Sequence, residues 1–355
     1  LEELAACGAP RDILVDAKPH VGTDYLHIAL RSLRRELIAL GTDVRFEHRL
    51  TDIRVEDGAL AAVTVEGPRG TEILACRHLI LAPGHSARDT FEMLLSRAVP
   101  MEPKAFAVGV RIEQRQRDID AAQYKEYAGA PGLPASTYKL SCHLPDGRAA
   151  FSFCVCPGGE VVAAASEEGR VVTNGMSEFA RDGENINGAL LVSVTPEDFG
   201  GEGPLAGVAF QRRLEEAAYA AGGRDYRAPA QRVEDFLAGR PSEGPGSVIP
   251  SYRPGVRWCD LHECLPPFVS ETIARALPIL GGRLPGYDAP DAVLTAVESR
   301  SSSPVRIPRG EDGQSPVRGL YPCGEGAGYA GGILSAAADG CRMAERVCLA
   351  IAREG

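Results

Sequence analysis

Five of the ten residues from 323 to 332, CGEGAGYAGG, are glycine. Gly326, Gly328 and Gly331 match G-x-G-x-x-G, a spacing typical of loops that bind dinucleotides. Such a loop ordinarily opens a strand–helix–strand unit, with an acidic residue about 20 positions later. Here only 24 residues follow Gly331, and they read as one helix. The run therefore predicts a loop that completes a cofactor site begun elsewhere; a flexible loop before a C-terminal helix is the alternative.

The flanks of this run supply the means to hold an anion or a cofactor. RGLYPCG before it reads as a strand, and ILSAAADGCRMAERVCLAIAREG after it reads as a helix. Glycine lets the backbone approach a ligand because it has no Cβ. The first turn of a helix presents unbonded N–H groups and the positive end of its dipole. Gly324, Glu325, Gly332 and Ile333 join the three fingerprint glycines as candidate cofactor-binding residues.

A second candidate turn lies in LAPGHSARDTFEML. Residues 78–82 read as a buried strand, and the turn Ala82, Pro83, Gly84 and His85 follows it. Ser86 and Asp89 have the spacing of a capping box at the start of a helix. The stretch is either an ordinary connection or the other edge of the cofactor site. His85 is a candidate proton donor beside a cofactor, or a histidine that hydrogen-bonds the backbone.

Two further segments carry polar groups that suit a substrate site. ESRSSSPVRIPR, residues 298–309, leads to the glycine run. It holds Arg300 and Arg306, candidates for binding an anionic substrate, a pyrophosphate or a reduced cofactor. Surface ion pairs are the alternative for both arginines. In residues 174–189, NGMSEFARDGENINGA, glycines are interspersed among polar side chains. The same composition also suits ordinary turns. The substrate candidates of this segment are Asn174, Ser177, Arg181 and Asn185.

Composition excludes several classes of protein. The chain has 355 residues and a net charge of −10, which argues against nucleic acid or an anionic membrane as partner. No apolar run approaches the roughly 18 residues of a membrane span. The ten cysteines are scattered and include no C-x-x-C, so we expect reduced thiols in a cytoplasmic protein. Zinc at Cys154 and Cys156, or at Cys259, His262 and Cys264, is a weak alternative, and no metal is expected.

The remaining pattern predicts an α/β protein with an insertion. Apolar residues three and four apart predict a helix over 23–40, capped by Thr23 or Asp24 and ended by Gly41. We expect a strand over 43–50 and a hairpin that turns at Asp57 and Gly58. From about residue 101 to 294, short β-like runs predict a mainly antiparallel sheet, with a helix over 203–223. The expected domains are therefore 1–100 with 295–355, and an inserted α+β domain at 101–294.

Matching stretches along most of the chain resemble a family of uncharacterised FAD-dependent dehydrogenases, within the glutathione-reductase-like flavoprotein superfamily. They are ILVDAKPHVGTD, LAPGHSARDTFEML, GVRIE, NGMSEFARDGENINGALLV, PSYRPGV, ESRSSSPVRIPR and GLYPCGEGAGYAGGILSAAADG. The resemblance implies an FAD-binding domain assembled from both ends of the chain. It further implies that Glu325 bonds ribityl hydroxyls, that N–H groups near Gly332 and Ile333 face the flavin, and that the turn 82–85 lies along FAD.

The resemblance also sets the functional expectation, an FAD-dependent oxidoreductase that acts on a small molecule. NAD(P)H is a candidate electron donor, and a non-catalytic binding or scaffold protein is the alternative. A flavoenzyme acting on RNA is disfavoured by the acidic charge. The family's ADP-binding strand–helix–strand unit has no counterpart before ILVDAKPH. We therefore expect this chain to bind FAD weakly or not at all, and its sheet edge to associate with another chain.

Overall fold

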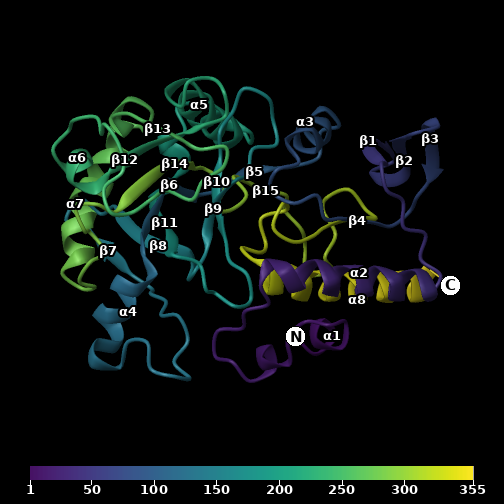
Figure 1. Ribbon diagram of the computed structural model, residues 1–355. Coiled ribbons are helices and arrows are strands. Elements are labelled where there is room, and N and C mark those ends of the chain that lie inside the picture. The colour runs from purple at the N-terminus through teal and green to yellow at the C-terminus, as the bar shows by residue number, and fades with distance from the viewer. Residues whose placement is uncertain (355) are drawn as a thin grey trace. The chain divides into compact units, whose positions relative to one another are not determined.

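The computed structural model describes residues 1–354 as a mixed α/β structure (Figure 1). The chain divides into two compact units, which are described separately. Unit 1 contains residues 1–42, 107–193 and 211–299. Unit 2 contains residues 43–106 and 194–210 and the described residues from Arg300 onward.

The centre of unit 1 is a seven-stranded sheet with the order β13-β12-β14-β6-β11-β8-β7 (Figure 1). Its strands are β6 (Phe106–Arg115), β7 (Ser141–His143), β8 (Ala149–Cys156), β11 (Asn185–Val194), β12 (Ala228–Arg232), β13 (Val256–Trp258) and β14 (Val293–Glu298). A separate two-stranded sheet pairs β9 (Glu160–Ala163) with β10 (Thr173–Met176).

Antiparallel pairing dominates the large sheet, as the sequence predicted. β7 with β8, β8 with β11, β6 with β14 and β12 with β14 are antiparallel, whereas β12 and β13 are parallel. β6 and β11 are buried along almost their whole length, although both carry polar residues. A Cβ at Gly109 of β6 would lie 2.0 Å from the carbonyl oxygen of Leu190, so only glycine fits there.

The helices of unit 1 come from distant parts of the chain. They are α1 (Glu2–Ala6), α2 (Thr23–Ala39), α4 (Gln116–Tyr124), α6 (Val233–Leu237) and α7 (Pro267–Gly281), together with most of α5 (Ala206–Ala221). The predicted helices at 23–40 and 203–223 are confirmed as α2 and α5. Short 3-10 turns add Arg11–Leu14, Lys125–Tyr127, Pro196–Asp198 and Leu261–Glu263 along the chain.

The predicted side-chain cap of α2 is wrong. Its N-cap is Gly22, and no side chain caps it. Thr23 donates its hydroxyl to the carbonyl of Ser177, and Asp24 accepts the N–H of Phe179. Both polar side chains therefore bind a neighbouring segment rather than the helix itself. Gly41 does end the helix, with φ of 93°, as predicted.

Unit 2 combines a β meander with a parallel strand pair. The meander is β1 (Arg49–Glu56), β2 (Ala59–Gly67) and β3 (Gly70–Ala75), and β4 (Leu79–Leu81) pairs in parallel with β16 (Leu320–Pro322). Its remaining elements are α3 (Arg88–Ser96), β5 (Glu102–Pro103), β15 (Val305–Arg306) and α8 (Ile333–Glu354). A shared core holds Ile53, Phe91 and Leu320, each at most 2% exposed.

The hairpin prediction is confirmed, because Asp57 and Gly58 both have positive φ, 49° and 72°. The predicted strand over 43–50 is only partly right. β1 begins at Arg49, and residues 43–48 lie in an irregular segment. Alternation of apolar and charged residues suggested a strand there, but no partner strand supplies the ladder bonds.

The two units differ from the expected domain boundaries in two segments. Residues 1–42 belong to unit 1 rather than with 43–100, and residues 194–210 belong to unit 2 rather than to the insertion. Local contacts explain the first difference, because Thr23 donates its N–H to Ser177 at 3.1 Å and His20 contacts the carbonyl of Glu178 at 3.0 Å. Packing explains the second difference, because Val208 lies in the hydrophobic core of unit 2.

Two further features concern the described residues as a whole. Within residues 1–354, no helix is long and apolar enough to cross a membrane. In the same span, no disulfide joins the cysteines.

Candidate functional site

The parallel pairing of β4 with β16 brings two sequence-distant turns together within unit 2. Leu320 pairs with Leu79, and Pro322 pairs with Leu81. The N–H of Cys323 continues the ladder by donating to the carbonyl of Leu81 at 2.9 Å. The glycine loop, residues 323–332, and the turn 82–85 therefore both leave the carboxyl ends of neighbouring parallel strands, an edge where ligands commonly bind.

Two glycines of the loop pack closely against other backbone, and the first of them contacts the turn 82–85. A Cβ at Gly326 would lie 2.3 Å from the carbonyl oxygen of Gly84 and 2.8 Å from its nitrogen. Gly328, with φ of 86°, is also tight: a Cβ there would lie 2.8 Å from the carbonyl of Val305. These fingerprint positions thus serve close backbone packing between turns, which glycine alone permits.

An ion pair fixes the start of the glycine loop. Asp339 of α8 accepts the N–H of Gly324 at 2.8 Å and two hydrogen bonds from Arg309, at 2.6 and 2.9 Å. The hydrogen bond from Arg309 lowers the pKa of Asp339, although burial opposes this. Neither residue was singled out from the sequence, because an aspartate inside a helix and an arginine in a loop are both ordinary.

Tyr329 anchors the far part of the loop. The guanidinium carbon of Arg309 lies 3.7 Å from its ring centroid, and that of Arg306 lies 4.9 Å away, which are cation–π distances. The N–H of Arg309 donates to the Tyr329 hydroxyl at 3.0 Å. Arg306 also donates to the carbonyl of Gly328 at 3.4 Å. The predicted Arg306 thus does adjoin the glycine loop.

Charged groups gather around Glu325. Its carboxylate lies 3.9 Å from Nδ1 of His85, and both side chains are partly buried. Burial raises the pKa of Glu325, and Lys104 opposes this. Burial also lowers the pKa of Lys104, with a further lowering from Arg306. The sequence gave no indication of Lys104, which follows a two-residue strand and donates to the hydroxyl of Ser302 at 2.8 Å.

The predicted capping box at the start of α3 does not form. The N-cap is Ala87, without a side-chain cap, and Arg300 donates to the hydroxyl of Ser86 at 3.0 Å. Arg300 is 8% exposed, so it is not a surface ion-pair residue. Its bond to Ser86 joins the segment 298–309 to the end of the turn 82–85.

The residues around the loop fit an extended polar ligand. A Cβ at Gly84 or Gly331 would meet nothing within 4 Å, so there is open space on that side of both residues. Within residues 1–354, Glu325 accepts no hydrogen bond, although its side chain is only 25% exposed. The carboxylate oxygens therefore have acceptor capacity available for a ligand's donors. Hydroxyl groups, such as those of a ribityl chain, match that acceptor.

The four polar candidates of residues 174–189 all lie in unit 1. Asn174 accepts a hydrogen bond from Arg111, and Asn185 donates to Glu113 and to the carbonyl of Ile249. The carbonyl of Ser177 accepts the hydroxyl of Thr23. Arg181 lines a cavity at the end of α4. As substrate residues, all four remain predictions.

A buried ion pair organises the sheet beneath these residues. Arg111, fully buried, donates to Glu298 at 2.6 and 3.0 Å and to the carbonyl of Cys154 at 2.8 Å. Burial raises the pKa of Glu298, and Arg111 opposes this. The pair joins β6 to β14, and Arg111 also donates to Asn174. A role in holding the sheet together therefore accounts for the two buried charges.

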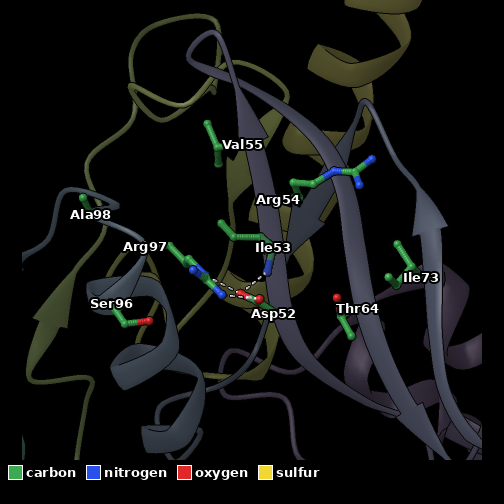
Figure 2. Close-up of a pocket in the computed structure, with 9 residues that line it drawn as sticks. All are labelled: Asp52, Ile53, Arg54, Val55, Thr64, Ile73, Ser96, Arg97 and Ala98. Carbon is green, nitrogen blue, oxygen red and sulfur yellow. Dashed lines mark hydrogen bonds and ion pairs between the residues drawn. The ribbon is translucent and has the colours of Figure 1, made fainter.

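A cavity of unit 2, about 580 Å³ in volume, lies away from the glycine loop, between the β meander and the end of α3 (Figure 2). Its charges are already neutralised. Arg97 donates to both carboxylate oxygens of Asp52, as the dashed lines show, and Arg54 pairs with Glu56 at 3.1 Å. We do not assign a ligand to it.

A relative matches almost the whole chain. A protein of Clostridium beijerinckii, known only as an uncharacterized protein, is 47% identical over 349 residues, which cover 98% of this chain. The chain spans 65% of the length of that relative.

Two solved structures also match, though weakly. The OxyS anhydrotetracycline hydroxylase from Streptomyces rimosus is 17% identical, with a TM-score of 0.23, over 49% of this chain and 27% of its own. A ternary complex of aklavinone-11 hydroxylase with FAD and aklavinone is 18% identical, with a TM-score of 0.24, over 52% and 28%.

The family described as "FAD-dependent protein, C-terminal domain-like" matches residues 105–301, more than half of the chain. This stretch contains the large sheet of unit 1 and ends before the glycine loop of unit 2. The chain therefore belongs to that FAD-dependent family.

Proposed function

We propose that unit 2 holds the flavin end of FAD and that the protein is a flavin-dependent oxidoreductase of the glutathione-reductase-like type. The family assignment supports FAD as the cofactor. The parallel strands β4 and β16, followed by two touching turns and α8, support the place. The assigned residues are Ala82, Pro83, Gly84, His85, Gly324, Glu325, Gly326, Gly328, Gly331, Gly332 and Ile333.

The observation that carries the proposal is the carboxylate of Glu325. It is half-buried and accepts no hydrogen bond within residues 1–354. In the proposed complex it accepts hydrogen bonds from ribityl hydroxyls, each worth about 1.5–3 kcal/mol when the acceptor is charged. Gly326 cannot be replaced without moving Gly84, so the glycines keep both turns in place around the ligand.

Bound flavin supplies hydride and electron transfer between a substrate and a second partner. The chain's own residues supply charge and orientation. Lys104 lies near Glu325, and Arg306 lies near Lys104 and the carbonyl of Gly328. Positive charge there, together with the N-terminus of α8 that follows the loop, would stabilise the negative charge that flavin reduction develops. In this proposal His85 and Arg300 are the candidates for proton transfer and for substrate binding.

The test is titration of the protein with FAD, followed by the quenching of flavin fluorescence. Glu325→Ala should weaken FAD binding by about tenfold or more, because it removes at least one charge-assisted hydrogen bond. Glu325→Gln should weaken it less, because the amide keeps an acceptor. Glu311→Ala, at an exposed glutamate of the same unit, is the matched control and should bind as the wild type does.

Equal FAD affinity in the wild type and both Glu325 variants would remove this residue from the site. An anaerobic absorption spectrum with NADH or NADPH separates the two functional classes. Bleaching of the flavin band supports an oxidoreductase that uses a nicotinamide donor. Bound flavin that no nicotinamide, dithionite or photochemical reductant can bleach would instead favour the non-catalytic alternative.

A further inference from the structure

Arg181 differs from the other polar side chains in its segment. Asn174 and Asn185 are both used in internal hydrogen bonds, to Arg111 and to Glu113. By contrast, the guanidinium of Arg181 makes no hydrogen bond or ion pair with residues 1–354, and its Nε is buried. A buried donor without an acceptor costs about 1–3 kcal/mol, so the position calls for an explanation.

The backbone holds Arg181 in an unusual conformation. Its φ is 52°, in the left-handed region that arginine rarely adopts. A Cβ at Gly158 would lie 2.0 Å from the carbonyl oxygen of Arg181, and Gly183 donates its N–H to the carbonyl of Gly158 at 3.2 Å. Glycines thus brace the loop on both sides. Local strain maintained in this way is typical of functional positions.

The cavity that Arg181 lines has a mixed wall. It measures about 360 Å³, within the range of small-molecule sites, and lies between α4, residues 129–135 and residues 181–184. Tyr124, Leu133, Pro134 and Ala135 make one part apolar. Two polar members are already occupied, because Gln116 accepts the N–H of Gly158 and Asp120 accepts that of Ser136.

The charges around the cavity indicate how much charge a ligand carries. Burial lowers the pKa of Arg181, and the nearby groups of Asp16 and Cys156 only partly oppose this, so a further anion beside the guanidinium would favour its charged form. Arg117 also lines the cavity, as do Asp120, Asp182 and Glu184, and these carboxylates repel a dianion more strongly than a monoanion. A monoanion therefore suits the site better than a phosphate dianion, and the apolar wall suits a ligand with a hydrocarbon body.

We propose that this cavity of unit 1 binds a small carboxylic acid with an apolar body, and that Arg181 pairs with its carboxylate. The planar guanidinium offers two parallel N–H groups, which match the two carboxylate oxygens. The hydrocarbon part lies against Tyr124, Leu133 and Pro134. The site does not depend on flavin binding, so its test is independent of the function proposed for unit 2.

His20 provides a reporter of the charge on Arg181. Its ring nitrogen contacts the carbonyl of Glu178 at 3.0 Å, and its ring stacks on Phe179. Burial lowers the pKa of His20; the charge of Arg181 lowers it further, whereas Glu178 and Asp24 oppose this. A bound carboxylate that neutralises Arg181 should therefore raise the pKa of His20.

The experiment is calorimetric titration with hexanoate, benzoate and inorganic phosphate, combined with NMR titration of His20. The resonance of His20 is identified by its loss in His20→Gln. We expect saturable binding of the two carboxylates, phosphate at least about tenfold weaker, and a higher pKa of His20 in the saturated protein. Arg181→Asn should weaken carboxylate binding by about tenfold or more, since a charge-assisted pair is lost.

The variants are chosen to separate binding from folding. Asparagine tolerates the left-handed region better than most residues, so Arg181→Asn should keep the loop conformation. Arg181→Lys keeps the charge but loses the two-pronged geometry, and intermediate affinity is expected. Arg35→Gln is the matched control, because Arg35 is an exposed arginine of unit 1 that does not line the cavity. It should bind within about twofold of the wild type.

Three results would overturn the proposal. They are an absence of saturable binding of either carboxylate, phosphate binding as tight as that of hexanoate, and carboxylate affinity unchanged in Arg181→Asn.

Discussion

The α-carbon of Gly326 faces the backbone of Gly84 so closely that a Cβ would lie 2.3 Å from the Gly84 carbonyl oxygen. These residues are 242 positions apart in the sequence, and the parallel strands β4 and β16 bring them together. The contact therefore links the glycine loop to the turn 82–85, and the proposed flavin site depends on it.

Gly326→Ala should destabilise unit 2, because backbone on both sides of the contact must move. Overpacking of this kind costs about 1–3 kcal/mol. Urea unfolding measures the change. Gly340→Ala is the matched control in α8, where a Cβ meets nothing within 4 Å and alanine is favoured in a helix by up to about 1 kcal/mol. A variant Gly326→Ala as stable as the wild type would mean that the two turns are not in contact.

Asp339→Asn should loosen the start of the glycine loop. The carboxylate accepts bonds from Arg309 and Gly324 and is almost fully buried, so losing its charge leaves Arg309 unpaired and costs about 3 kcal/mol. The pKa of Asp339 is lowered in the folded protein. Its contribution is therefore present above the unfolded value of about 3.9 and is lost as pH falls through the lower folded value.

The difference in unfolding free energy between wild type and Asp339→Asn should thus be largest near pH 7 and shrink below about pH 4. Urea unfolding at several pH values measures it. A difference that does not change with pH would show that the aspartate contributes by packing rather than by charge.

Arg111→Met should be strongly destabilising, by about 3–5 kcal/mol, because it leaves the buried carboxylate of Glu298 without its cation. Burial raises the pKa of Glu298, so the folded variant takes up a proton more readily than the unfolded chain. The loss of unfolding free energy in Arg111→Met, relative to the wild type, should therefore become smaller as pH is lowered from 8 toward 5.

The double variant Arg111→Met, Glu298→Met tests the same pair differently. It should recover much of the loss, since two apolar side chains replace both charges. Thermal unfolding of the two single variants and the double variant gives the coupling. Additive effects in this cycle would contradict a direct interaction between the two side chains.

The elements of this protein follow largely from local patterns. Apolar residues three and four apart predicted α2, the Asp57-Gly58 pair predicted the β1–β2 hairpin, and short β-like runs predicted β6 and β8. Each pattern acts over a few residues, through hydrogen bonds and turn preferences within the segment itself. Membership of a flavoprotein family was also evident, because many segments carried the resemblance in order.

Tertiary contacts decided what the polar residues do. Ser86 has the spacing of a helix cap but accepts a hydrogen bond from Arg300, 214 residues away, and Asp24 binds Phe179 instead of its own helix. Lys104 gathers with Arg306 and Glu325 although nothing in its local sequence marks it. Arg181 stands out only because its neighbours Asn174 and Asn185 are paired elsewhere. Such roles depend on which distant donors and acceptors the packed strands bring within hydrogen-bond distance, about 3 Å. The local sequence does not determine which groups those are.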